Sequence, residues 1–208
     1  MFKNILLLVR VNKVLFNTNM NINRGALIVL EGCDRSGKST QCKKLVASLR
    51  EQNILVEMMS FPDRTTATGK LITDYLLKKI ELNDRTIHLL FSSNRWELAL
   101  KMEEKLHSGI TLIIDRYAYS GVAYSAIKSK MELDWCKQSD VGLPKPDLVF
   151  LLTLSSEALA KRPGYGDERY EQIITQQLVA EMYLKLADDC WKIIDADECT
   201  QYNQRSSK

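Results

Sequence analysis

Short apolar runs alternate with longer segments of helix-forming residues from Gly25 onward. Five of these runs read as strands, at residues 26–31, 54–60, 110–114, 148–154 and 191–194. Each is separated from the next by a stretch long enough for a crossover helix, which is the pattern of an α/β protein with a buried parallel sheet. Because ligands of such sheets bind beyond the carboxyl ends of the strands, we expect the functional residues directly after the runs.

Good helix formers dominate the segments between the runs. They predict helices at residues 41–50, 69–79, 84–107 and 168–189. Gly109 is the predicted stop of the third helix, and Gly142 with the prolines after it breaks the chain before the fourth strand. No repeat, low-complexity segment or linker interrupts the pattern. The sequence therefore predicts one domain over residues 24–197 and a polar tail at residues 198–208.

A phosphate-loop pattern lies between the first predicted strand and the first predicted helix. Residues 32–40 read Gly-Cys-Asp-Arg-Ser-Gly-Lys-Ser-Thr. In such a loop backbone N–H groups surround the β-phosphate, Lys38 reaches the β- and γ-phosphate oxygens, and the Ser39 hydroxyl can ligate Mg²⁺. The sequence thus predicts a nucleoside triphosphate site formed by Gly32, Ser36, Gly37, Lys38, Ser39 and Thr40.

Charged residues follow the strands at the same predicted edge of the sheet. Asp115 closes the third run and is the type of acid that holds a Mg²⁺ shell in phosphate-loop enzymes, although a strand-end turn or helix cap would also use it. Arg64 and Arg116 follow the second and third runs, and Arg35 lies inside the loop. One triphosphate does not need three arginines, whereas a site that clamps a second phosphorylated molecule does. Surface salt bridges are the alternative for each arginine taken singly.

Phe91 and Arg95 are four residues apart and share one face of the third predicted helix. On that face the ring could stack on a planar base while the guanidinium hydrogen-bonds the edge of the base. The alternative is core packing of Phe91 beside a solvated Arg95. Spacing alone favours this alternative.

The composition is that of an ordinary globular protein, with 208 residues of which 45% are hydrophobic and 26% charged. The net charge of +3 arises at the start of the chain, because residues 1–24 hold four basic residues and no acid. The remainder is close to neutral, which argues against nucleic acid or a membrane as a partner. The five cysteines show no paired spacing and indicate reduced intracellular thiols. His88 and His107 are expected on helix surfaces rather than as metal ligands.

Residues 1–23 combine an apolar stretch with scattered basic residues and loosely resemble an organelle transit peptide. The apolar run at residues 5–9 is too short to span a bilayer. Met20 lies just before the first strand, so translation from that residue would still yield a complete domain. An extension outside the domain is favoured over a targeting segment. The expected compartment is the cytoplasm, and the basic extension leaves the nucleus or a mitochondrion open.

Five motifs resemble those of thymidylate kinases of the eukaryotic type and occur in the same order. They are residues 32–40, 61–64, 89–96 (Leu-Leu-Phe-Ser-Ser-Asn-Arg-Trp), 115–124 and 142–147 (Gly-Leu-Pro-Lys-Pro-Asp). The resemblance covers roughly residues 24–196 and implies a three-layer, doubly wound, five-stranded parallel sheet of the phosphate-loop kinase type. It also implies transfer of the γ-phosphate of ATP to dTMP, giving dTDP, with Mg²⁺ and usually in a homodimer.

The resemblance assigns roles on the acceptor side. Phe91 is similar to the ring that stacks on thymine and Arg95 to the partner of the base carbonyl, which reverses the preference from spacing alone. Asp34 resembles the carboxylate that contacts the sugar hydroxyl, and two aromatic walls would exclude ribonucleotides by their bulk. The implied dTMP site comprises Asp34, Phe61, Arg64, Phe91, Arg95, Arg116, Tyr124 and Tyr170.

The resemblance also bears on catalysis. An arginine at the position of Arg35 marks the version of the family in which the phosphate loop supplies the main catalytic cation. Residues 161–171 resemble the mobile lid, in which Arg162 is expected to touch ATP, while Arg169 is either a lid contact or a surface charge. The implied catalytic residues are Lys38, Arg35, Asp34, Asp115 and Arg116, with Ser39 and Asp115 holding Mg²⁺ partly through water.

Two alternatives stay open beside the kinase. A deoxynucleoside kinase would leave the arginines without a phosphate to pair. A catalytically silent nucleotide-binding module would have no need of Lys38, Ser39, Arg35 and Asp115 together. The resemblance would continue past residues 194–196 into a terminal helix that the polar tail does not predict, so we expect lower stability than in a relative with that helix.

Overall fold

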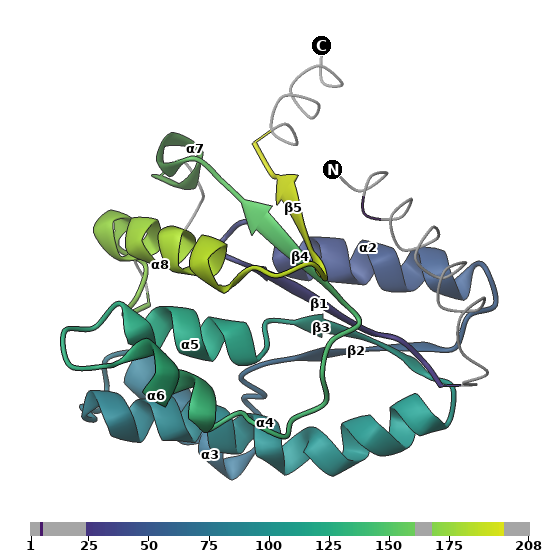
Figure 1. The fold of residues 1–208 in the computed structure, drawn as a ribbon, viewed down its shortest axis with the longest axis horizontal. Helices are drawn as coiled ribbons and strands as arrows, with labels where there is room; N and C mark the ends of the chain where they lie inside the picture. Colours follow the sequence, from purple (N-terminus) through teal and green to yellow (C-terminus); the bar gives the residue numbers. More distant parts are fainter. Residues whose placement is uncertain (1–4, 6–23, 161–167, 198–208) are drawn as a thin grey trace.

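The computed structural model describes residue 5, residues 24–160 and residues 168–197 (Figure 1). The strands are β1 (Leu27–Gly32), β2 (Val56–Ser60), β3 (Thr111–Asp115), β4 (Leu148–Thr153) and β5 (Trp191–Asp195). The helices in the described part are α2 (Lys38–Arg50), α3 (Ala67–Leu76), α4 (Asp84–His107), α5 (Ala118–Ala126), α6 (Leu133–Gln138), α7 (Ser156–Ala160) and α8 (Ile173–Leu186).

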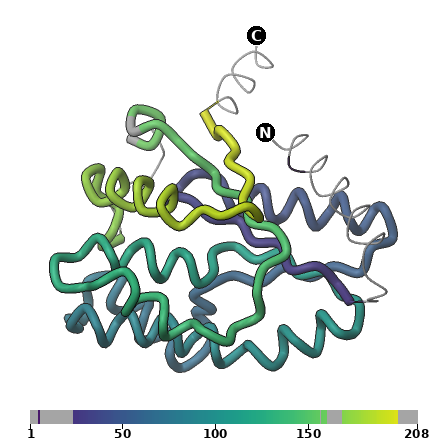
Figure 2. Tube along the Cα trace, in the orientation of Figure 1, coloured from purple at the N-terminus to yellow at the C-terminus, as the bar shows by residue number. Residues whose placement is uncertain are grey.

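The strands form one parallel sheet in the order β2-β3-β1-β4-β5. The chain path in Figure 2 shows the first strand at the centre, with later strands added on both of its sides. Parallel strands place all their carboxyl ends at one edge, so β1, β2 and β3 deliver the residues that follow them to a common place. The predicted α/β fold with a doubly wound sheet is confirmed.

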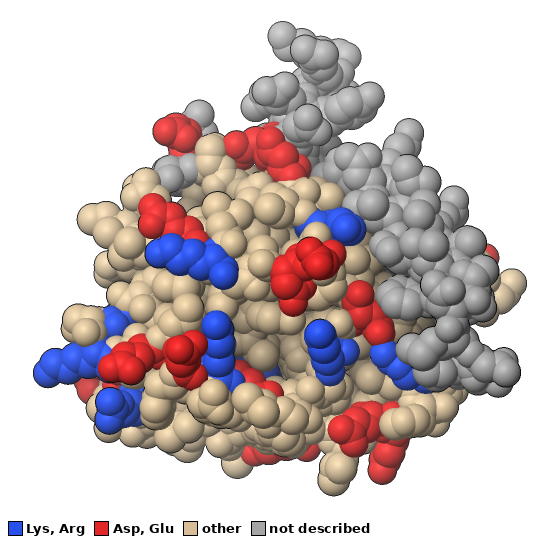
Figure 3. All heavy atoms as spheres, viewed as in Figure 1, with Lys and Arg blue, Asp and Glu red and all other residues tan. Residues whose placement is uncertain are grey.

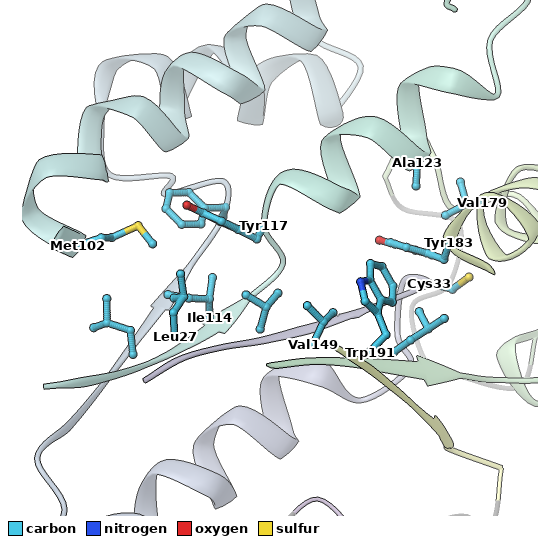
Figure 4. Packing of buried hydrophobic residues seen from close by; sticks show 14 of the residues in the cluster. Leu27, Cys33, Met102, Ile114, Tyr117, Ala123, Val149, Val179, Tyr183 and Trp191 are labelled. Atoms are coloured by element: carbon cyan, nitrogen blue, oxygen red, sulfur yellow. The ribbon is translucent and has the colours of Figure 1, made fainter. Parts of the chain in front are cut away.

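Alternate side chains of β1 enter two different cores. Leu27 and Val29 pack in a cluster with residues of α4, α5 and α8, part of which is shown in Figure 4. Ile28 and Leu30 point the other way, into a cluster with the buried face of α2. Ile5 is buried in this second cluster. Both faces of the sheet carry apolar side chains, and helices cover both faces. The fold therefore has three layers.

Helix boundaries differ from the predicted ones where capping decides them. Thr66 caps α3 by accepting a hydrogen bond from the Gly69 amide at 3.1 Å, so this helix begins before the predicted residue 69. α4 has the predicted bounds. The predicted helix at residues 168–189 is wrong at both ends, since α8 spans Ile173–Leu186 and residues 168–171 instead contact other elements.

The predicted surface position of His88 is wrong, whereas that of His107 is confirmed. His88 is fully buried and links three elements: Nδ1 lies 2.8 Å from Ser125 Oγ on α5, and Nε2 lies 3.0 Å from Ser139 Oγ after α6. Burial and, next, the charge of Arg95 lower the pKa of the imidazole. A neutral ring bridging two hydroxyls therefore replaces the expected solvated one.

The surface mixes charges of both signs. Figure 3 shows Lys and Arg side chains interspersed with Asp and Glu over one face of the molecule. Among the described residues, no helix has the length and apolarity needed to cross a membrane.

Candidate active site

The phosphate loop joins the central strand β1 to α2, and its backbone requires glycine. Gly32 has a φ of +140°, and a Cβ on this residue would lie 2.4 Å from the carbonyl oxygen of Leu152. Gly37, with a φ of +93°, leads into α2, whose first residue is Lys38. Gly32 thus lets the loop pass close to β4, and Gly37 turns the chain so that the amino end of α2 faces the cavity.

Lys38 is buried under the loop, and its Nζ donates a hydrogen bond of 2.5 Å to the carbonyl oxygen of Cys33. Burial, followed by the positive charge of Arg116, lowers the pKa of Lys38 to about 8. Bound phosphate would supply the negative charge that the buried ammonium needs. Lys38 also lines the cavity described below, and its contact with a triphosphate stays a prediction.

Ser39 and Asp115 lie side by side, as the predicted metal site requires. Ser39 Oγ donates a hydrogen bond of 2.5 Å to Asp115 Oδ2. Mg²⁺ takes oxygen ligands and commonly keeps several waters, so one hydroxyl and one carboxylate on adjoining elements fit it. The described residues include no group of three or more His, Cys, Asp or Glu side chains that could hold a metal ion.

Asp34 and Arg116 form the centre of the site. Arg116 Nη2 donates to Asp34 Oδ1 at 2.6 Å, and its Nη1 donates to the Gly32 carbonyl oxygen at 3.0 Å. Tyr124 adds a hydroxyl that donates to Asp34 Oδ2 at 2.9 Å. Burial raises the pKa of Asp34, but the charges of Arg116 and Lys38 outweigh burial and hold the pKa below its ordinary value. Asp34 is therefore a stable anion at the junction of the two predicted nucleotide sites.

Gln176 is part of this network and was missed from the sequence. Its amide donates to Asp34 Oδ2 at 2.8 Å, and its Oε1 accepts from the Asp34 backbone N–H at 2.8 Å. It lies on the buried face of α8 with Val179 and Tyr183. A lone polar residue at helical spacing from apolar ones was the available signal.

Glu31, the residue before Gly32, was also missed as a functional group. Its fully buried carboxylate accepts from the Tyr117 amide at 2.9 Å, the Ser120 amide at 3.1 Å and the Tyr183 hydroxyl at 3.1 Å. Burial raises its pKa. Glu31 caps the amino end of α5 from β1 and so fixes the turn that carries Arg116.

Residues 168–171 bring carboxylates to the predicted phosphate-binding arginines. Glu168 accepts from Arg64 at 2.7 Å, and Glu171 accepts from Arg35 Nε at 2.7 Å. Arg169, between them, stacks 4.1 Å from the Tyr75 ring centroid and pairs with Glu81, which attaches this segment to the end of α3. Of the two expectations for Arg169, an unpartnered surface charge is wrong, because its guanidinium is bound to Tyr75, Ile80 and Glu81. Arg162 and the rest of the predicted lid lie outside the described residues.

Twelve of the predicted site residues line one cavity of about 330 Å³, whereas the predicted ATP-site residues Gly32, Ser36, Gly37 and Thr40 are not among its lining residues. Those that line it are Asp34, Arg35, Lys38, Ser39, Phe61, Arg64, Phe91, Arg95, Asp115, Arg116, Tyr124 and Tyr170. Phe91 is half-buried, with one side packed against the cluster of α3 and α4 and the other facing the cavity. Arg95 is only 2% exposed, so the alternative of a solvated arginine is wrong.

A phosphate loop and several arginines that line the same cavity are the features of a nucleotide kinase of the phosphate-loop class. The chain belongs to the thymidylate kinase family, because the protein-family model described as thymidylate kinase matches residues 30–206. The thymidylate kinase of Danio rerio is 52% identical over 180 residues, which are 85% of each chain. That of Homo sapiens is 50% identical over 182 residues, 86% of each. The solved thymidylate kinase of Candida albicans has a TM-score of 0.77 at 40% identity, covering 88% of this chain and 90% of that one.

Proposed function

We propose that this protein transfers the γ-phosphate of ATP to dTMP, giving ADP and dTDP. The observation that carries the proposal is that residues of the phosphate loop line the same cavity as Phe91 and Arg95. Arg64 and Arg116 line the same cavity. A cavity of this kind fits an acceptor that has both a planar base and a phosphate.

The donor end would act by position and charge. Lys38 and the loop amides hold the β- and γ-phosphates, and Arg35 offsets the charge that develops on the transferred phosphoryl group. Ser39 and Asp115 would hold Mg²⁺ partly through water, and the ion would neutralise part of the phosphate charge. We infer that Arg162 touches ATP.

The acceptor end would orient dTMP in line with the donor. Phe91 stacks on thymine, Arg95 donates to a base carbonyl, and Arg64 with Arg116 holds the phosphate. Asp34 contacts the sugar, and Tyr124 with Tyr170 leaves no room for a ribose hydroxyl. In support, the two tyrosine rings pack 5.4 Å apart between centroids. Arg64 and Arg116 also favour a phosphorylated acceptor over an uncharged nucleoside, because a nucleoside has no phosphate for them to bind.

The test is ADP release in a coupled assay with dTMP, dUMP, thymidine or no acceptor. We expect the highest kcat/KM with dTMP and ADP release without acceptor at background level. Turnover of thymidine but not dTMP would indicate a nucleoside kinase instead. No turnover with any acceptor would indicate a silent nucleotide-binding module. Chelation of Mg²⁺ should abolish the activity, and added Mg²⁺ should restore it.

We also propose a homodimer. An exposed apolar stripe on α4, formed by Leu89, Trp96 and Leu100, has helical spacing and lies on the surface of the described chain. Light scattering after size exclusion should give twice the mass of one chain, and Leu100→Asp should halve it. A single-chain mass for the unaltered protein would contradict the dimer.

For compartment and boundaries we propose a cytoplasmic protein whose domain is residues 24–197, with residues 1–23 and 198–208 outside it. Mass spectrometry of the mature protein tests the first boundary. A mature protein that begins at Met1 or at Met20 fits the proposal. Cleavage between these two residues, together with import into mitochondria, contradicts it.

A further inference from the structure

One face of α4 holds the turn that follows α6. His88, Ser92 and Trp96 lie at intervals of four residues, so they share that face. Ser92 Oγ and Trp96 Nε1 each donate to the Ser139 carbonyl oxygen at 2.8 Å, and His88 Nε2 lies 3.0 Å from Ser139 Oγ. Three side chains from one rigid helix thus fix the backbone and side chain of Ser139.

The next residue of the turn, Asp140, is bound to Arg95. Its Oδ1 accepts from Nε of Arg95 at 3.0 Å and from Nη2 at 2.9 Å, and its Oδ2 accepts from Nη2 at 2.7 Å. Ser92 Oγ also donates to Oδ1, at 2.9 Å. The two side chains of the pair are 2% and 5% exposed. The plane of the guanidinium is therefore set by a carboxylate that is itself held in place.

The pairing with Asp140 leaves one edge of the Arg95 guanidinium available to a ligand in the cavity. Nε and Nη2 are used by Asp140, and among the described residues none accepts from Nη1. Gly121 on α5 gives the guanidinium its room, since a Cβ there would lie 2.7 Å from Nη2 and 3.1 Å from Nη1. Arg95 also lines the cavity. The charge is neutralised on one side, while the N–H groups of Nη1 stay available on the other.

We propose that Asp140 is the positioning residue that makes Arg95 selective for a base carbonyl. The inference rests on the proposed function, in which thymine occupies this end of the cavity. Thymine carries a carbonyl where cytosine carries an amine. A fixed N–H donor pairs with the carbonyl and is left unpaired against the amine. Without Asp140 the arginine could rotate, and its donor would no longer be oriented in advance.

The test is the affinity of the full-length protein and of Asp140→Asn for dTMP and dCMP, measured by calorimetry. We expect dTMP binding to weaken roughly tenfold to a hundredfold, the scale of a hydrogen bond from a charged donor. Binding of dCMP should change less than about threefold, because it does not use that bond. The matched control is Asp134→Asn on α6, an exposed carboxylate that should leave both affinities unchanged.

Loss of one partner of a buried ion pair can unfold a protein, so a milder variant accompanies the first. Ser92→Ala removes one bond to Asp140 and one to the Ser139 carbonyl oxygen, and should lower the dTMP-to-dCMP affinity ratio less than Asp140→Asn. An unchanged ratio in folded variants, or equal loss for both nucleotides, would overturn the role of Asp140 alone. A wild-type protein that does not phosphorylate dTMP would overturn the proposed function as well.

Discussion

The two ends of the acceptor cavity hold their arginines in different ways. At the base end Arg95 pairs with Asp140, and the side chains are 2% and 5% exposed. At the phosphate end Arg64 pairs with Glu168, and the side chains are 47% and 30% exposed. A buried pair is costly to separate, whereas a half-exposed pair contributes about 0–1 kcal/mol and exchanges readily. We infer from this difference that the donor to a neutral carbonyl is fixed in advance, whereas the acceptor phosphate displaces a carboxylate.

Arg35 lies between these two cases. It pairs with Glu171, and the side chains are 30% and 7% exposed. We therefore expect Glu171 to orient Arg35 before the donor binds and to yield part of the contact to the γ-phosphate.

The largest expected effect comes from Arg35→Ala. Turnover should fall by about 10³- to 10⁵-fold, because the cation that stabilises the transferred phosphoryl group is lost. Affinity for dTMP should change little, since the base end of the cavity is untouched. Steady-state kinetics with a calorimetric Kd separates the two quantities. Arg50→Ala, at the exposed end of α2, is the control. Equal losses in turnover and affinity would contradict the assignment.

Next in size is Phe91→Ala. Loss of base stacking should weaken dTMP binding by about 1–3 kcal/mol, or roughly fivefold to 150-fold. Turnover at saturating dTMP should fall much less. Leu90→Ala is the matched control, because Leu90 packs in the same cluster but is not among the residues that line the cavity. If both variants weaken dTMP equally, packing rather than stacking explains the loss.

The low pKa of Lys38 predicts a pH effect at the donor end. Since the charged form binds phosphate, kcat/KM for ATP should fall about tenfold per pH unit above about 8. The fall in kcat should begin at a higher pH than the fall in kcat/KM, because bound phosphates raise the pKa of Lys38 in the complex. A rate profile for kcat/KM that stays flat to pH 10 would count against a titrating Lys38 in the free enzyme.

Deprotonation of Lys38 lowers activity as the pH rises, but it should raise the stability of the folded protein. Between about 8 and its ordinary value of 10.5, Lys38 keeps its proton in the unfolded chain but loses it in the folded protein. The unfolded state then binds more protons, so the free energy of unfolding should rise with pH in this window. Urea denaturation without ligands measures it, and Lys38→Met should remove that contribution.

The smallest expected effect is that of Glu168→Gln. Removing the carboxylate that competes for Arg64 should tighten dTMP binding by at most about fivefold, the scale of an exposed ion pair. Glu157→Gln, on the exposed side of α7, is the control. Weaker binding in Glu168→Gln would mean that Glu168 supports the bound phosphate instead of giving way to it.

Much of the donor end was predictable because its residues are close in sequence or follow strands. The loop at residues 32–40, Asp115 and Arg116 all follow the alternation of strands and helices. The positioning residues were not predictable. Asp140 lies 45 residues from Arg95, and Gln176 lies 142 residues from Asp34, so only the folded topology brings them together.

Two local features were also hidden in the sequence. α5 contains Gly121 and several β-branched or aromatic residues, which lower its helix propensity, and Glu31 stabilises it from a distant strand. Residues 168–171 contain ordinary helix formers, but tertiary ion pairs with Arg64 and Arg35 hold them outside α8. In both places contacts distant in sequence override the local preference.

A structure of the protein with dTMP and a non-hydrolysable ATP analogue tests the contrast between the two ends most directly. The bonds from Arg95 to Asp140, now 2.7 to 3.0 Å, should persist while Nη1 meets a base carbonyl. The Arg64 to Glu168 contact of 2.7 Å should open, with the acceptor phosphate in its place. A complex in which Arg95 leaves Asp140, or in which the phosphate binds with the Arg64 pair intact, would contradict the account.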